Sequence, residues 1–292
     1  MFLESVCYNT AMESVKVKAY AKINLTLFVT GTENGYHMLD SIVASVDLYD
    51  LIKIKKRRDK LVSVTMHGMG SETIPHESNN AARAAELFVA KFGTNGADIT
   101  VYKNIPMGAG LGGSSADAAG VLNGLAKLYK VDDLTALKLL ADETGSDTRY
   151  MLTGGWARLY GRGNVVKAID SGLKAHIFLL VPSGGVSSAR CYSAFDKVGK
   201  TGGNSDTAER AAALNDLNGL AKQLSNSLMP AAASLSDGIS DCIEELNEFA
   251  PLAVNMTGSG SGVYALFENK EMCAYAKSRY RGKAKTYILE VK

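Results

Sequence analysis

A glycine-rich stretch in the first half of the sequence has the composition of a phosphate-binding loop. Residues 103–119 read KNIPMGAGLGGSSADAA, with no charged residue between Lys103 and Asp117. A glycine loop that leads into a helix presents unpaired backbone N–H groups and the positive end of the helix dipole. The stretch therefore predicts a phosphate site over residues 108–115, with the N–H groups converging at Gly113 and the two serines after it.

Three better-known loop types fit this stretch only in part. Gly108, Gly110 and Gly113 satisfy the G-x-G-x-x-G dinucleotide pattern, but the predicted order strand, loop, helix, helix lacks the second strand. Ser114 stands where the lysine of the common nucleotide-hydrolase loop belongs, and a protein-kinase glycine loop would lie between two strands. Alternatively, either serine could cap the helix, with Asp117 adding favourable first-turn charge, but one cap leaves most of the glycines unexplained.

The elements that must position this loop are strands in the first hundred residues and grouped helices after them. Alternating apolar and β-branched residues predict strands, and apolar positions three and four apart predict helices. The predicted strands are 15–20, 23–30, 42–54, 61–66, 99–103, 156–160, 175–181, 253–256, 263–268 and 284–291. The predicted helices are 80–92, 116–129, 133–143, 147–152, 208–224, 231–247 and 270–280. This grouping favours an α+β fold over a regularly alternating parallel sheet.

Composition divides the chain into two candidate lobes. A break near residue 170 separates a lobe over 15–170 from one over 171–292, and residues 1–14 are predicted to be a flexible N-terminal extension. The extension lacks the basic start and long apolar core of a secretory signal. No apolar run reaches the roughly 18 residues that a membrane span needs, so no membrane span is expected.

Charge and cysteine content narrow the function classes. Thirty-two basic and thirty acidic residues give a net charge of +2, which argues against a dedicated nucleic-acid surface. The densest basic run, 53–58, is best explained as the solvated end of a strand. Cys7, Cys191, Cys242 and Cys273 are widely spaced, which predicts neither a zinc site nor disulfides and favours a reduced cytoplasm.

The glycine loop resembles the central motif of the GHMP family of small-molecule kinases, P-x-x-x-G-L-G-S-S-A. The stretch from Pro106 to Ala116 matches it with one extra glycine. Two further stretches are similar to the same family: AKINL at 21–25 with GYHMLDS at 35–41, and MTGSGSG at 256–262. The similarity runs from about residue 15 over nearly the whole chain. It is strongest to the branch that acts on a cytidylyl methylerythritol in non-mevalonate isoprenoid synthesis.

This resemblance implies a fold and a reaction. The fold is two-lobed and α+β, with an N-terminal lobe like that of ribosomal protein S5 and a ferredoxin-like C-terminal lobe. ATP and substrate would meet in the cleft between the lobes. The γ-phosphate of ATP would pass to the 2-hydroxyl of the methylerythritol unit.

By this resemblance the glycine loop holds the phosphates of ATP. Mg²⁺ would bridge phosphate oxygens, with the Ser115 hydroxyl as a candidate ligand. Asn79 and Lys103 correspond to family positions near the adenosine, and a loop cap or an exposed strand position is the alternative for each. The predicted phosphate-binding residues of the loop are Pro106, Met107, Gly108, Ala109, Gly110, Leu111, Gly112, Gly113, Ser114 and Ser115.

Lys22 and Asp147 are the pair expected to carry catalysis. The stretch Gly145-Ser146-Asp147 resembles the family's G-A-D, whose aspartate would accept or orient the substrate hydroxyl proton; a helix N-cap is the alternative. Lys22 would keep that carboxylate ionised and balance charge on the transferred group. Asn24 shares a strand face with Lys22, and such a polar face beside a phosphate loop is better explained as a cleft wall than as solvated surface.

The resemblance also implies a substrate pocket beside the loop. Tyr36 and His37 would line it, one ring stacking on the cytosine with Tyr192 as the partner ring; ordinary packing of the tyrosines is the alternative. The loop over residues 257–262 is expected to approach the substrate phosphates, unless it is a plain flexible hairpin. The predicted substrate-binding residues are Asn24, Tyr36, His37, Ser188, Tyr192, Thr257, Gly258, Ser259 and Gly260.

The sequence departs from the family pattern at three places. Thr148-Arg149-Tyr150 stands where the family has V-P-F, so another residue must define the helix start. Asn226-Ser227-Leu228-Met229 replaces N-D-[LF]-E and loses both acids, and Arg190 stands where an acid is frequent. Arg149 could bind a substrate phosphate or pair with an acid. Because each change adds positive or removes negative charge, a related phosphorylated acceptor is an alternative substrate.

Three functions are therefore open at this point. The first is the cytidylyl methylerythritol kinase, and the second is a GHMP kinase with a different polyol or isoprenoid-type acceptor. The third is a non-catalytic ATP-binding regulator, against which the presence of Lys22, Asn24 and Asp147 counts. The expected partner is a small molecule, without nucleic acid or membrane, and the expected assembly is a monomer or a homodimer.

Overall fold

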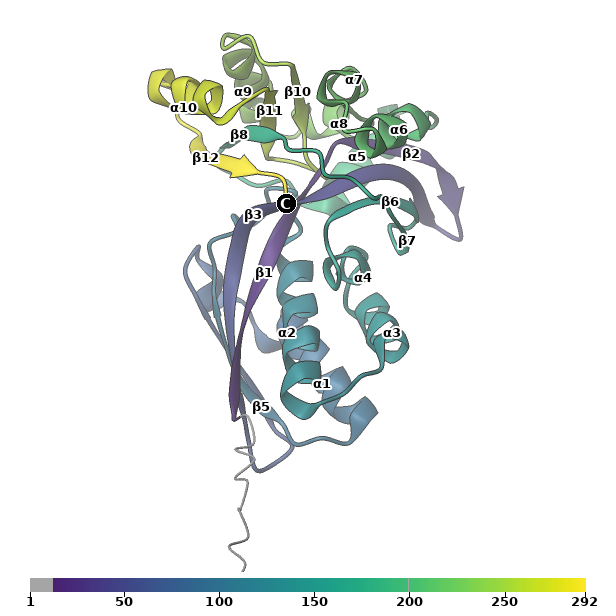
Figure 1. Cartoon of the computed structure of the whole chain (residues 1–292), viewed down its shortest axis with the longest axis vertical. Helices are drawn as coiled ribbons and strands as arrows, with labels where there is room; N and C mark the ends of the chain where they lie inside the picture. The colour runs from purple at the N-terminus through teal and green to yellow at the C-terminus, as the bar shows by residue number, and fades with distance from the viewer. Residues whose placement is uncertain (1–12, 199) are drawn as a thin grey trace, which may run out of the picture.

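The computed structural model describes residues 13–198 and 200–292, which form two sheets with helices packed against them (Figure 1). Ser14 already begins the first strand, so the extension predicted over residues 1–14 lies almost wholly outside the described residues. Within the described ranges no helix is long and apolar enough to cross a membrane. The order of strands and helices confirms the predicted α+β class.

The larger sheet is built around one long strand, β3 (Tyr36–Lys56). Its antiparallel partners are β1 (Ser14–Asn24), β2 (Thr26–Glu33), β5 (Ala97–Tyr102) and β6 (Trp156–Gly161). The outer strands are β4 (Val62–His67), parallel to β5, β7 (Val165–Ala168), antiparallel to β6, and β9 (Ser225–Asn226), parallel to β2. Ile52 and Ile54 are buried while Lys53 and Lys55 are exposed, because this sheet has one covered face.

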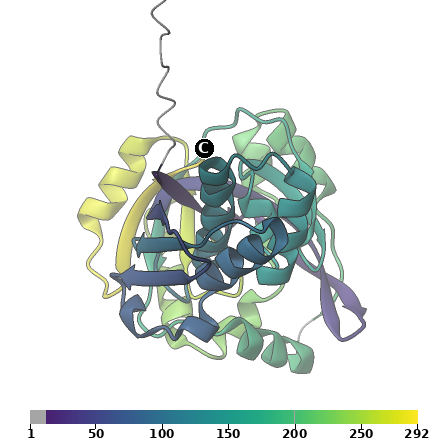
Figure 2. The same cartoon turned by 90° about the horizontal axis from the view of Figure 1, so that it is seen from below.

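Helices cover that face of the larger sheet, and the β2–β3 hairpin projects to one side (Figures 1 and 2). They are α1 (Asn80–Phe92), α2 (Gly113–Tyr129), α3 (Leu134–Thr144) and α4 (Thr148–Met151). α2 lies very close to the strands, since a Cβ at Gly120 or Gly124 would come within 2.7 and 2.4 Å of the δ-carbons of Ile52 and Ile54. A larger residue at either position would push α2 away from the strands, so the two glycines allow the middle of the helix to pack closely on the sheet.

The smaller sheet has the antiparallel order β10-β11-β8-β12. Its strands are β8 (His176–Val181), β10 (Ala253–Met256), β11 (Val263–Phe267) and β12 (Lys285–Glu290). The helices of this lobe are α5 (Ser188–Val198), α6 (Asp206–Ala213), α7 (Leu217–Ala221), α8 (Met229–Ala233), α9 (Asp237–Asn247) and α10 (Lys270–Arg279). A second apolar core forms between one face of this sheet and α5, α8, α9 and α10, whereas α6 and α7 pack on the core of the larger sheet.

Two predicted helices are wrong in their continuity. The helix predicted over 208–224 is α6 and α7, because Asn215 adopts a left-handed φ of 57° and Asp216 then caps α7 by accepting the N–H of Gly219. The helix predicted over 231–247 is α8 and α9, separated by Ser236 in an extended conformation. The sequence analysis also missed α5 and the short β7.

Candidate active site

A cavity of about 450 Å³ lies where the start of α2 meets the end of β1 and two loops of the smaller lobe. Its lining includes every predicted site residue except Tyr36, His37 and Thr257. It also includes Ser146, Arg162, Gly163 and Asp117, which the sequence analysis did not assign to the site. Segments far apart in the sequence, including β1, the glycine loop and α5, thus meet around one space.

Lys22 and Asp147 come together on the wall of this cavity. The Lys22 ammonium nitrogen lies 3.5 Å from a carboxylate oxygen of Asp147 and donates to Asn24 Oδ1 at 2.5 Å. The Lys22 side chain is only 5% exposed, so the solvated-lysine alternative is wrong. Asp147 occupies the N-cap position of α4 but makes no side-chain capping bond, so its carboxylate is available to a ligand.

The glycine loop is held through its carbonyl groups. The carbonyl of Gly108 accepts the N–H of Ser261 at 3.0 Å, and the carbonyl of Ala109 accepts that of Gly262 at 3.3 Å. The carbonyl of Leu111 accepts the N–H of Lys22 at 3.1 Å, and Gly110 O accepts the Thr257 hydroxyl at 3.1 Å. Among the described residues none accepts a hydrogen bond from the backbone N–H groups of residues 107–115, so these groups are available to a ligand.

Packing between the lobes explains part of the glycine content. A Cβ on Gly110 would lie 1.9 Å from the carbonyl oxygen of Thr257, and one on Gly108 would lie 3.2 Å from Gly185 Cα. The prediction that the loop's glycines serve phosphate binding was therefore incomplete, because these two also admit backbone from the smaller lobe. The loop over residues 257–262 is buried against them and is not a plain flexible hairpin.

α2 starts without a side-chain cap. Its N-cap residue is Gly112, with a left-handed φ of 71°, and no side chain bonds to the first turn from that position. Ser114 and Ser115 lie inside the helix, so the serine-cap alternative is wrong. Gly113, Ser114 and Ser115, which carry the first N–H groups of α2, line the cavity, as an anion site at a helix start requires.

Asn24 and Asn79 both make internal hydrogen bonds at the edge of the cavity. Asn24 Oδ1 accepts the N–H of Gly258 at 3.0 Å, and its Nδ2 donates to Ser41 Oγ at 2.8 Å, so the side chain joins β1 to the smaller lobe. Asn79 Oδ1 accepts the N–H of Ala81 at 2.9 Å, which confirms the capping alternative. Asn79 also lines the cavity, so the cap does not remove it from the site.

Lys103 is a buried lysine beside the loop, so the exposed-strand alternative is wrong. Its ammonium pairs with Asp50 and donates to Asp117 Oδ2 at 2.6 Å. A Cβ on Gly113 would lie 3.4 Å from this nitrogen, which places a lysine against the start of α2 although the loop sequence itself has none. The lysine comes from the residue after β5 instead.

Asp117 differs most from its predicted role. It lies beyond the first turn of α2 and pairs with Lys103, so the predicted first-turn charge is wrong. Burial raises the pKa of Asp117 to about 7, Lys103 offsets only part of that rise, and the nearby Asp50 adds to it. Its Oδ1 is buried without a hydrogen-bond partner among the described residues. Asp50, by contrast, accepts three hydrogen bonds through its two carboxylate oxygens.

Aromatic side chains gather at the other end of the cavity. His37 stacks on Tyr192 with ring centroids 4.6 Å apart, and its Nε2–H donates to Asp196 Oδ1 at 2.6 Å. Tyr36 is exposed, with the Arg162 guanidinium 4.5 Å from its ring centroid. Of the three predicted aromatic residues, Tyr192 lines the cavity and Tyr36 and His37 do not, and His37 covers one face of the Tyr192 ring. Ser188 and Ser259 hydroxyls meet at 2.8 Å beside it.

The departures from the family pattern have local structural explanations. Thr148 starts α4 by donating its N–H to Gly145 O at 3.0 Å, in place of the missing proline. Arg149 pairs with Asp142 and does not line the cavity, which confirms its pairing alternative. Asn226 Nδ2 donates to Met256 O and Gly258 O, both at 2.8 Å, and so holds the second loop in place. Arg190 is exposed on α5.

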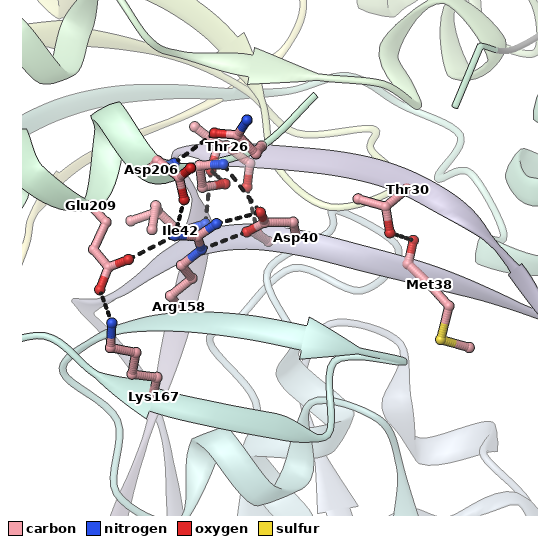
Figure 3. Close-up of polar contacts among 12 residues, drawn as sticks. Thr26, Thr30, Met38, Asp40, Ile42, Arg158, Lys167, Asp206 and Glu209 are labelled. Atoms are coloured by element: carbon pink, nitrogen blue, oxygen red, sulfur yellow. Dashed lines mark hydrogen bonds and ion pairs between the residues drawn. The ribbon is translucent and has the colours of Figure 1, made fainter. Parts of the chain in front are cut away.

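An ionic network around the buried Arg158–Asp40 pair ties the larger sheet to α6 (Figure 3). Arg158 donates from Nε to Asp40 Oδ1 at 2.8 Å and from Nη1 to Asp206 and Glu209, both at 2.7 Å. Lys167 lies 2.6 Å from Glu209 and, with Arg158, lowers the pKa of that carboxyl. Asp40 lies between Leu39 and Ser41, which both line the cavity, so the network holds in place the part of β3 that forms this wall.

Comparisons with known proteins fit this geometry. The GHMP kinases N terminal domain model matches residues 79–157, and the GHMP kinases C terminal model matches residues 208–274. The chain is 37% identical over 279 residues to 4-diphosphocytidyl-2-C-methyl-D-erythritol kinase of Caldicellulosiruptor saccharolyticus, covering 94% of this chain and 95% of the relative. It is also 37% identical to the enzyme of that name from Desulfitobacterium hafniense, covering 88% of each chain.

Solved structures give the same result. A crystal structure of 4-(cytidine 5'-diphospho)-2C-methyl-D-erythritol kinase is similar with a TM-score of 0.74 and 29% identity, covering 94% of this chain and 99% of that one. Homoserine kinase from Cytophaga hutchinsonii has a TM-score of 0.72 at 17% identity, covering 100% and 97%, which reports on the fold alone.

Proposed function

The chain belongs to the GHMP kinase family, and on that premise we propose that it is a 4-diphosphocytidyl-2-C-methyl-D-erythritol kinase. It transfers the γ-phosphate of ATP to the 2-hydroxyl of that acceptor, in non-mevalonate isoprenoid synthesis. The observation that carries the proposal is the Lys22–Asp147 pair on the wall of a cavity that also holds the free N–H groups of the glycine loop. A non-catalytic regulator would not need this pair.

The glycine loop is the proposed phosphate site. Its carbonyls are occupied by Lys22, Thr257, Ser261 and Gly262, which leaves the N–H groups and the uncapped start of α2 for phosphate oxygens. On this proposal Asn79 and Lys103 serve the nucleotide, and Ser188, Tyr192 and the loop over residues 257–262 serve the acceptor. What supports this assignment is that Asn79, Lys103, Ser188, Tyr192 and residues 258–260 all line the one cavity.

The transfer step needs a group that handles the acceptor proton and a cation that balances charge. The acceptor hydroxyl oxygen bonds to the γ-phosphorus as the bond from that phosphorus to the β-phosphate oxygen breaks, and the proton passes to Asp147. Lys22, fixed by Asn24, pairs with Asp147 before the step and faces the negative charge of the phosphoryl group during it. ADP is the other product.

Mg²⁺ fits the residues present in a limited way. Within residues 13–198 and 200–292 no cluster of three or more His, Cys, Asp or Glu could hold a metal ion. Mg²⁺ in kinases is held mainly by phosphate oxygens and waters with one or two protein ligands, so the Ser115 hydroxyl on the cavity wall suffices as a protein contact. When bound, the ion would neutralise phosphate charge.

The location in the cytoplasm and the assembly as a monomer or a homodimer remain predictions.

The acceptor is tested directly with purified enzyme and ATP. We expect ADP release and a new phosphomonoester signal in ³¹P NMR with 4-diphosphocytidyl-2-C-methyl-D-erythritol, and none with the same polyol phosphate lacking the cytidylyl group. Turnover of the uncytidylylated polyol at an equal or higher rate would assign a different acceptor. If the enzyme turned over ATP with neither of the two acceptors, the proposal would be contradicted.

A further inference from the structure

Asp50, Lys103 and Asp117 connect the two ends of the glycine loop, and we propose that these three residues act as an ionic clasp that positions the loop for the triphosphate. Lys103 is at the N-terminal end of the loop, Asp117 is on α2 beyond it, and Asp50 is on β3 beneath both. The proposal rests on the proposed function because it assigns the clasp to ATP binding. The clasp residues are positioning residues for that step.

The N-terminal end of the loop is fixed by Asp50. This fully buried carboxylate accepts the backbone N–H of Asn104 at 2.6 Å and that of Ile105 at 2.9 Å through one oxygen. Its other oxygen pairs with the Lys103 ammonium. One side chain therefore determines the direction in which three consecutive residues leave β5 and enter the loop.

The C-terminal end of the loop is fixed through the same ammonium. Lys103 Nζ donates to Asp117 Oδ2 at 2.6 Å, so the nitrogen bridges β3 and α2. The bridge lies against Gly113, the first residue of α2, where a Cβ would be 3.4 Å from the nitrogen. The spacing between the loop's two ends, and with it the direction of the N–H groups, is thus set by one buried cation.

The chemistry of the clasp favours a positioning role over a purely stabilising one. All three side chains are buried, and two carboxylates share one ammonium, so one negative charge is left over when both are ionised. Replacing a buried ionic group by packed apolar side chains is often neutral or stabilising. An arrangement this costly to bury is therefore best explained by the geometry that it imposes.

The test measures loop mobility and ATP use in the same variants. For Asp117→Asn and Asp50→Asn we expect hydrogen exchange at the amides of residues 104–115 to accelerate about tenfold or more without nucleotide. We expect the KM for ATP to rise by a similar factor, while the KM for the acceptor stays unchanged. Asp98→Asn is the matched control. It changes an acid of β5, the strand that precedes the loop, and this acid pairs with Arg57 outside the clasp. It should change neither the exchange rate of the loop amides nor the KM for ATP.

A triple variant separates positioning from stability. Lys103→Met with Asp117→Leu and Asp50→Asn removes all three buried charges, so no buried ion is left without a partner. We expect a melting temperature near that of the unmodified protein, with loop exchange still fast and the KM for ATP still high. Slow exchange and an unchanged KM for ATP in this variant would overturn the clasp. If the unmodified protein failed to use ATP, the proposed function would fail, and exchange in the nucleotide-free protein would still decide whether the clasp orders the loop.

Discussion

The ammonium of Lys22 lies 3.5 Å from the carboxylate of Asp147, and the same residue's backbone N–H bonds to the carbonyl of Leu111 in the glycine loop. One residue of β1 therefore fixes the distance between the proposed proton acceptor and the proposed phosphate site. This relationship explains how a loop without its own lysine can serve a kinase. The cations are Lys22 on β1 and Lys103, the residue after β5.

Asp147→Asn should abolish most of the activity. The amide cannot accept the acceptor proton, so we expect kcat to fall by about 10²–10⁴ with a nearly unchanged melting temperature, since Asp147 makes no capping bond. ADP release at saturating substrates measures the change. Asp142→Asn, an acid that pairs with Arg149 away from the cavity, is the matched control; an equal loss there would indicate a general effect of charge.

Gly110→Ala should disrupt the contact between the lobes. A left-handed φ of 71° and a Cβ placed 1.9 Å from Thr257 O both oppose alanine at this position. Gly93→Ala is the matched control, because φ is 64° there and no atom lies within 4 Å of the new Cβ. We expect the control to lose about 1 kcal/mol in the free energy of unfolding and Gly110→Ala to lose clearly more. Equal losses in urea denaturation would show that the contact with Thr257 is unimportant.

Tyr192 should contribute to acceptor binding through its ring. Tyr192→Ala removes a stacking surface worth about 1–3 kcal/mol per base, so we expect the KM for the cytidylyl acceptor to rise about tenfold or more, with the KM for ATP unchanged. Tyr192→Phe keeps the ring and should stay close to the unmodified protein. A large effect of Tyr192→Phe would instead assign the role to the hydroxyl, and no effect of Tyr192→Ala would remove Tyr192 from the acceptor site.

Asp117 should make stability depend on pH. Its pKa rises from the usual value near 3.8 to about 7 on folding, so the folded chain holds a proton that the unfolded chain releases between these values. The contribution to the free energy of unfolding is therefore complete below about pH 4 and is lost as the pH rises towards 7. Asp117→Asn should show a flatter profile over this range in urea denaturation. Parallel profiles for the two proteins would contradict the shift.

Arg158 should be important for stability but not for the chemistry. Arg158→Met leaves the buried Asp40 without its partner, and breaking such a pair costs about 3–5 kcal/mol. We expect a lower free energy of unfolding in urea, and kcat close to that of the unmodified protein under conditions where the variant is folded. Lys167→Met removes an exposed member of the same network and should cost far less. A loss of kcat in folded Arg158→Met would assign Arg158 a role at the cavity.

The sequence predicts much of this arrangement, and the limits have physical causes. Local signals were sufficient for α1, whose predicted bounds 80–92 agree with Asn80–Phe92, and for β10 at 253–256. The same signals missed the breaks at Asn215 and Ser236, where a left-handed or extended residue interrupts a continuous apolar pattern. The pairing of Lys22 with Asp147 was predicted from the family resemblance, because the spacing of the two residues in the sequence does not show that they are close in space.

The clasp and the Arg158 network lay beyond sequence reasoning. Their members pair between segments far apart in the sequence, as Asp50 on β3 does with Lys103 after β5 and Asp40 on β3 does with Arg158 on β6. Nothing in their local sequence marks the partner. Asp117 was predicted to interact with the helix dipole because the sequence places it near the start of α2 but does not show that Lys103 lies beside it. Gly108 and Gly110 are glycines partly because backbone of the other lobe packs against them. From the sequence alone this reason cannot be distinguished from phosphate binding, because the position of the other lobe is not known.

The most direct test of the account is a titration of the ¹⁵N-labelled protein with a non-hydrolysable ATP analogue, followed by amide NMR. We predict that the N–H resonances of residues 107–115 shift together with one dissociation constant, because these groups bind the phosphates. A titration in which the analogue binds but those resonances stay unmoved would contradict the central claim that the backbone amides of this loop grip the triphosphate.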